Sequence, residues 1–70
     1  MSLAFVEHHG LFTRNVNAED GGHRLFTVQA TPGQHFAAVS ITSGAMHFSM
    51  TKREAVALAR ALVDAVKELS

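Results

Sequence analysis

Residues 46–54 read Met46-His47-Phe48-Ser49-Met50-Thr51-Lys52-Arg53-Glu54, and an alternating pattern changes there into a helix start. Met46, Phe48 and Met50 alternate with more polar residues, which is typical of a strand with one covered face. Thr51 and Glu54 have the Thr-x-x-Glu spacing of a capping box, in which each side chain binds a backbone N–H of the first turn. We therefore predict a strand that ends at residue 50 and a helix that begins at residue 52.

The segment 52–69 carries the clearest periodicity in the chain. Its apolar residues recur at three- and four-residue steps, which predicts an amphipathic helix. The stripe consists of Ala55, Leu58, Ala59, Leu62, Val63, Val66 and Leu69. Because almost no linker separates the helix from the preceding strand, we expect this stripe to cover the sheet face that carries Phe48.

Gly and Pro residues divide the upstream sequence into strands. Residues 31–34, Thr-Pro-Gly-Gln, favour a type II turn, Ser43-Gly44 favours a tight hairpin turn, and residues 17–22 form a polar, Gly-rich loop. The remaining segments predict strands near 4–16, 23–30, 35–42 and 45–50. Within the first strand Gly10 leaves two explanations open, a bulge that switches faces or a break between two short strands.

The two turns can be tested against the hydrophobic pattern, because a slip of one residue would move every side chain to the other face. Hairpins centred on Pro32-Gly33 and on Ser43-Gly44 both place apolar residues on one face, with a central row of Phe26, Val39 and Phe48. We therefore predict one α+β domain spanning residues 1–70. It is a two-layer ββββα fold, a four-stranded antiparallel meander with the C-terminal helix packed on one face.

Composition limits the classes of function. The chain is 47% hydrophobic and 17% charged, and its six basic and six acidic residues cancel. Neutrality argues against a nucleic-acid or membrane-surface role, because phosphate binding needs an excess of Lys and Arg. The absence of Cys excludes disulfides and thiolate metal sites. With no transmembrane or secretory pattern in the sequence, we expect a cytoplasmic protein without membrane association.

Small size favours self-association. A domain of 70 residues buries too little surface to be very stable alone, so we expect a homo-oligomer, with a dimer as first choice. The predicted outer face of the sheet carries no charged residue, and small residues also follow one line of the helix. The interface candidates are Leu25, Phe36, Ala38, Ser40, His47, Ala57 and Ala61.

The helix start contains a local electrostatic conflict. Lys52 and Arg53 occupy the first turn, where the helix dipole disfavours positive charge. With His35 expected opposite Lys52, these three residues are candidates for binding an anion or phosphate. The alternative is that the Thr51 and Glu54 cap offsets the conflict and the long side chains extend into water.

The histidines do not form a recognisable catalytic or metal motif. His23, His35 and His47 are spaced by twelve residues, which a meander with units of this length produces by itself. We expect no metal or other cofactor. His47 is expected beside Ser40, but no carboxylate on that face could orient its imidazole for catalysis.

The sequence therefore predicts a small non-enzymatic, oligomeric interaction module. It would bind itself or a protein partner through the uncovered sheet face or a strand edge. One alternative is a single-stranded nucleic-acid-binding module, although the chain has neither Trp nor Tyr for base stacking. Another is a metal or small-ligand site built from histidines at a subunit interface.

Overall fold

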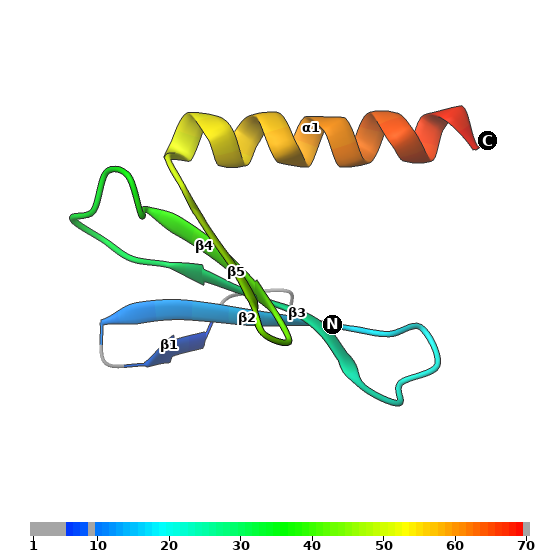
Figure 1. The fold of residues 1–70 in the computed structure, drawn as a ribbon, viewed down its shortest axis with the longest axis horizontal. Coiled ribbons are helices and arrows are strands. Elements are labelled where there is room, and N and C mark those ends of the chain that lie inside the picture. The colour runs from blue at the N-terminus through cyan, green and yellow to red at the C-terminus, as the bar shows by residue number, and fades with distance from the viewer. Residues whose placement is uncertain (1–5, 9, 70) are drawn as a thin grey trace.

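The computed structural model of the chain describes residues 6–8 and 10–69, which form an open antiparallel sheet followed by one helix (Figure 1). The strands lie in sequence order across the sheet. They are β1 (Val6–His8), β2 (Leu11–Asn17), β3 (Arg24–Ala30), β4 (Val39–Ser43) and β5 (Met46–Met50), and the helix is α1 (Lys52–Glu68). The predicted antiparallel meander with a C-terminal helix is confirmed.

The segment predicted as one strand over residues 4–16 contains two strands. Val6 pairs with Thr13 and His8 with Leu11, so the chain reverses between β1 and β2. Gly10 lies in this reversal with φ +77°, a left-handed conformation that favours glycine. Of the two explanations for Gly10, the break is therefore the one observed. Residues 4, 5 and 9 of the predicted strand lie outside the described residues.

The helix begins as the capping box predicts. The Glu54 amide donates to the Thr51 hydroxyl at 3.2 Å, and the Thr51 amide donates to the Glu54 carboxylate at 2.8 Å. These reciprocal bonds satisfy two N–H groups that the first turn of a helix leaves without backbone partners.

The predicted register of the first hairpin is wrong by four residues. The Pro32-Gly33 turn does form, with Gly33 at φ +84° and the Gln34 amide 3.4 Å from the Thr31 carbonyl oxygen. However, it is one part of a longer loop, which the Thr31 amide closes by donating to the Ala38 carbonyl at 2.9 Å. Strand β4 therefore begins at Val39 rather than near residue 35.

The second hairpin is shifted by two residues from the prediction. Ser43 pairs with Met46, so the two-residue turn is Gly44-Ala45, with Gly44 at φ +58°. Because both shifts are even, every side chain keeps its predicted face. The predicted row of Phe26, Val39 and Phe48 is replaced by two rows. These are Val28, Ile41 and Phe48, and next to it Ala30, Val39 and Met50.

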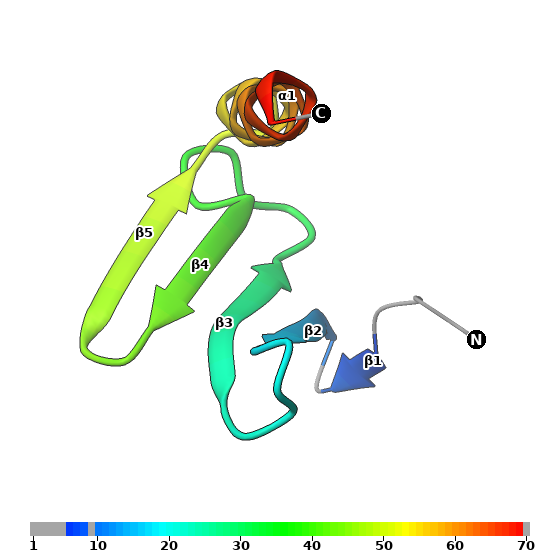
Figure 2. The same ribbon diagram turned by 90° about the vertical axis from the view of Figure 1, so that its right-hand side faces the viewer.

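Helix α1 lies on the predicted side of the sheet, but its contact with the sheet is partial. Ala55, Leu58, Ala59 and Leu62 line a hollow of about 200 Å³ together with Val28, Val39, Ile41 and Met50 of the sheet. Figure 1 shows the helix diverging from the sheet towards its C-terminal end, and Figure 2 shows it end-on beyond the ends of β4 and β5. Leu62, halfway along the helix, remains 61% exposed.

The described part of the chain contains almost no buried core. Its two buried residues are Ala38 and Ser40, each 6% exposed, and neither is large. The helix and the sheet each keep an apolar side that the other does not fully cover. The apolar side chains of the helix and of the sheet thus lie on faces that point towards each other but are not closely packed. A single chain therefore gains only a small part of the free energy that burying these side chains would supply.

Candidate functional site

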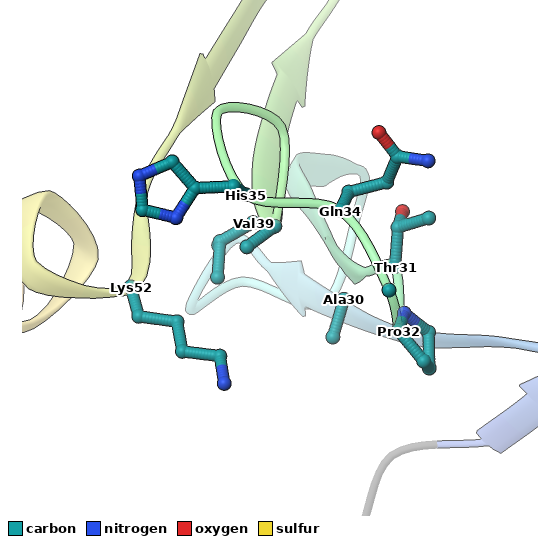
Figure 3. Close-up of a pocket in the computed structure, with 9 residues that line it drawn as sticks. Ala30, Thr31, Pro32, Gln34, His35, Val39 and Lys52 are labelled. Carbon is teal, nitrogen blue, oxygen red and sulfur yellow. The ribbon is translucent and has the colours of Figure 1, made fainter.

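One hollow lies beneath the loop that joins β3 to β4 (Figure 3). Its volume is about 560 Å³, and its lining comes from the end of β3, the loop, the start of β4 and Lys52 at the start of α1. The Val39 and Ala30 side chains point into the same space as the Lys52 side chain, whereas Gln34 points away from it. The walls are therefore mainly apolar, and the one charged group is an ammonium on a flexible stem.

A second hollow adjoins the first and contains all three anion-binding candidates. His35, Lys52 and Arg53 line it with Gln34 and Thr51, in a volume of about 470 Å³. The predicted strand pairing of His35 with Lys52 is wrong, because His35 lies in the loop rather than in a strand. The loop nevertheless carries His35 to the start of the helix. Its ring is held edge-on against Phe36, with ring centroids 4.7 Å apart.

The capping box weakens the argument for an anion at this helix start. The Glu54 carboxylate is bound to the Thr51 amide and so already places a negative charge at the positive end of the helix dipole. A bound anion would have to share that position with the carboxylate, although Lys52 and Arg53 would attract it. Anion binding by His35, Lys52 and Arg53 stays a prediction.

The outer face of the sheet is a grid of uncharged hydrogen-bonding side chains. Paired residues across β2, β3, β4 and β5 form two rows, one of Asn15, Thr27, Thr42 and His47 and the other of Thr13, Gln29, Ser40 and Ser49. The Thr27 hydroxyl donates to the side-chain amide oxygen (Oδ1) of Asn15 at 3.1 Å. None of these eight side chains carries a formal charge when the imidazole is neutral, as expected for this face.

His47 lies within this grid, bonded on both sides. It faces Thr42 rather than Ser40, because the hairpin register is shifted by two residues. Its Nδ1 lies 2.9 Å from the Thr42 hydroxyl and its Nε2 lies 3.3 Å from the Ser49 hydroxyl. Both ring nitrogens of His47 therefore have a hydroxyl neighbour, one on β4 and one on β5, on the outer face of the sheet.

The interface candidates lie in different places. Leu25, on β3, is 40% exposed, and Phe36, in the loop after β3, projects with 79% of its surface exposed. Ala38 and Ser40 are buried within the chain. These candidates do not form one continuous patch.

The helix candidates Ala57 and Ala61 are on its charged side. A helix advances about 100° per residue, which places Ala57 and Ala61 in the same arc as Glu54, Asp64 and Glu68. The opposite half of the helix is apolar over about 180° by the same geometry. The small-residue line is therefore flanked by carboxylates, and the large apolar residues point elsewhere.

A second apolar line of the helix was missed by the sequence analysis. Val56 and Val63 are 51% and 54% exposed, and with Ala59 they line a hollow of about 360 Å³ on the flank turned away from the sheet. Arg60, Asp64 and Lys67 form its polar edge. The three-and-four spacing of Val56, Ala59 and Val63 is present in the sequence, but the predicted stripe included Ala59 and Val63 and left out Val56.

Three other results bear on function. Within residues 6–8 and 10–69, no group of three or more His, Asp or Glu side chains is placed to hold a metal ion. The helix that the structure describes is not long and apolar enough to cross a membrane. Comparisons of the chain with protein-family models, with curated proteins and with solved structures found no match.

Proposed function

We propose that this protein is a non-enzymatic, self-associating interaction module whose hydrophobic core is completed by another copy of the chain. The observation that carries the proposal is the absence of any buried Leu, Ile, Val, Phe or Met in the described part of the chain. A single copy would therefore forgo most of the burial that stabilises a small domain. Association of two copies would bury these apolar side chains against each other.

The exposed area is consistent with this proposal. The chain has a solvent-accessible surface of 5865 Å², whereas a folded monomer of about 7.5 kDa is expected to expose roughly 4,250 Å². The excess is roughly 1,600 Å². Half of that excess would equal the area of about 800 Å² that each partner contributes to a standard stable interface.

Several of the exposed large apolar residues lie together on one face of the sheet. Val16, Phe26, Met46 and Phe48 are each at least 40% exposed, and strand pairing places all four on the sheet face turned towards the helix. Large contiguous apolar surfaces are uncommon on soluble monomers and indicate an interaction site. The net charge of zero means that no overall repulsion opposes association of identical copies.

The outer grid is the second part of the proposed module. Its donors and acceptors are uncharged, so we expect a protein partner that offers neutral hydrogen-bonding groups. Such a contact would avoid the free-energy cost of removing water from a charged group. Self-association through the helix side would leave the exposed members of this grid, Asn15, His47 and Ser49, accessible on each copy. Binding of a protein partner through the outer face would thus be compatible with the oligomer.

Sedimentation equilibrium of the full chain tests the proposal. We expect a mass of at least twice 7.5 kDa at micromolar concentration. A folded species of 7.5 kDa, with cooperative unfolding and native-like circular dichroism at the same concentration, would show that one copy completes its own core and would contradict the proposal.

A further inference from the structure

We infer that two copies of this chain pair antiparallel along the outer edge of strand β5, so that their two sheets join into one. This inference rests on the proposed self-association and names the surface that carries it. Strand β5 is the last strand of the sheet, and within residues 6–8 and 10–69 no strand pairs with its outer side (Figure 2). The occupant of this edge is β5 of a second copy, related by a two-fold axis through Phe48.

The two edges of the sheet differ in their protection. Native proteins protect an edge strand by shortness, charged residues, proline or bulges, because an open edge readily pairs with another strand. Strand β1, at one edge, has three residues and includes Glu7. Strand β5, at the other, has five residues, none of which is Lys, Arg, Asp, Glu or Pro. Its pairing with β4 runs without a register shift, so β5 is the unprotected edge.

The backbone of β5 has the right groups directed outwards for this axis. A two-residue turn joins Ser43 to Met46, so these two residues form the hydrogen-bonded pair that closes the hairpin. Hydrogen-bonded and non-hydrogen-bonded pairs alternate along an antiparallel ladder, so His47 and Ser49 direct their backbone N–H and C=O groups away from β4. The axis through Phe48 places His47 opposite Ser49 of the other copy. The outward groups of these two residues therefore form the hydrogen-bonded pairs of the seam.

The order of residues in β5 favours a second copy as the strand that fits this edge. The strand reads Met-His-Phe-Ser-Met, which has nearly the same pattern in both directions about Phe48. In the two-fold pair Met46 lies opposite Met50 of the other copy, and Phe48 lies opposite its own counterpart. Apolar residues thus meet apolar residues on the helix side, and His47 meets Ser49 on the outer side. None of the other strands that the structure describes has this symmetry.

The pairing covers apolar side chains that a single copy leaves exposed. Met46 and Phe48 are 60% and 52% exposed, and both lie on the sheet face turned towards the helix. In the pair each of them gains an apolar side chain of the other copy as its neighbour across the seam. Helix α1 begins directly after Met50 and Thr51, so the helix of the second copy begins beside the Met46 end of the first. Both helices then lie on the same side of one joined sheet.

Single cysteines test the pairing, because the natural chain has no Cys and a disulfide can form only between copies. Residues of a non-hydrogen-bonded antiparallel pair have Cα atoms about 4.5 Å apart, which a disulfide can span. Met46→Cys mixed with Met50→Cys should therefore give a linked heterodimer. Neither variant alone should link, because residue 46 lies four positions along the strand, roughly 13 Å, from its own counterpart.

We expect the mixture to contain roughly tenfold more linked product than either variant alone, measured in a glutathione redox buffer by mass spectrometry of the unreduced protein. Sedimentation equilibrium of the natural chain accompanies the test. If the natural chain is a dimer but mixing gives no more linked product, the β5 seam is wrong while the self-association stands. If the natural chain is a monomer, both proposals fail.

Proline at the edge tests the backbone pairing independently. Ser49→Pro removes an outward N–H that the seam uses, and leaves every N–H that β5 donates to β4. Ser49→Ala is the matched control, because it loses the same hydroxyl beside His47 and keeps the N–H.

We expect Ser49→Pro to weaken dimerisation by more than roughly a hundredfold and Ser49→Ala to change it less than about threefold, measured by sedimentation equilibrium. Equal dissociation constants for the two variants would overturn the assignment. Far-ultraviolet circular dichroism establishes that both variants fold, and if Ser49→Pro does not, the cysteine pair decides.

Discussion

Leu62 and Val63 are consecutive residues of α1 that line two different hollows, Leu62 against the sheet and Val63 on the adjacent flank of the helix. Both side chains are more than half exposed. The helix has apolar residues for two contacts, and a single chain provides only an incomplete version of one.

The helix cap should contribute measurably to stability. Replacing Thr51 by Ala removes the hydroxyl that accepts from the Glu54 amide. We expect the free energy of unfolding to fall by about 1 kcal/mol. Thr51→Ser keeps an acceptor in the same place and should stay within a few tenths of a kcal/mol of the natural chain. Urea unfolding of both variants at one protein concentration provides the comparison, and equal losses for Ala and Ser would mean that the bond is not the source of stability.

The β4–β5 turn should show a clear order among substitutions at Gly44. Its φ of +58° is a left-handed conformation, which costs an L-residue with a Cβ about 1–2 kcal/mol. Gly44→Ala should therefore destabilise the protein by about 1 kcal/mol, and Gly44→Asn by less, since Asn tolerates this conformation better. No atom lies within 4 Å of an added Cβ, so a clash would not account for the loss. Equal stability of the Ala and Gly proteins would place the turn elsewhere.

Binding to single-stranded DNA should be absent. The six basic and six acidic residues cancel, and the eight side chains of the outer grid include no Phe, Tyr or Trp for base stacking. Fluorescence anisotropy with a labelled oligothymidine should show no change at low salt and micromolar protein. Binding that weakens steeply with added salt would favour the nucleic-acid alternative over the interaction module.

The sequence predicted local features better than long-range ones. The Thr51 and Glu54 cap and the bounds of the helix depend on residues a few positions apart, and the structure confirms them. The Pro32-Gly33 turn also forms. Its role was misjudged because a turn motif fixes four residues of backbone, whereas the length of the loop around it depends on which strand residues pair. The even size of the shift reflects the hydrophobic pattern, which tolerates a slip of two or four residues but not of one.

The candidate site was predicted less well. His35 reaches the start of the helix as expected, but through the loop and not through strand pairing. The distance of the helix from the sheet could not be predicted, because an apolar stripe indicates which side is covered and not how closely. Because of that distance Leu62 stays exposed, as Val56 and Val63 do on the adjacent flank of the helix.

The central claim is that folding of this chain is completed by a second copy, and thermal unfolding across a hundredfold range of protein concentration tests it most directly. For a two-state dimer this range changes the apparent stability by roughly 2.7 kcal/mol. We therefore predict that Tm rises by roughly 5–10 °C from the lowest to the highest concentration. A Tm that does not change with concentration, for a species that unfolds cooperatively as a monomer, would contradict the claim.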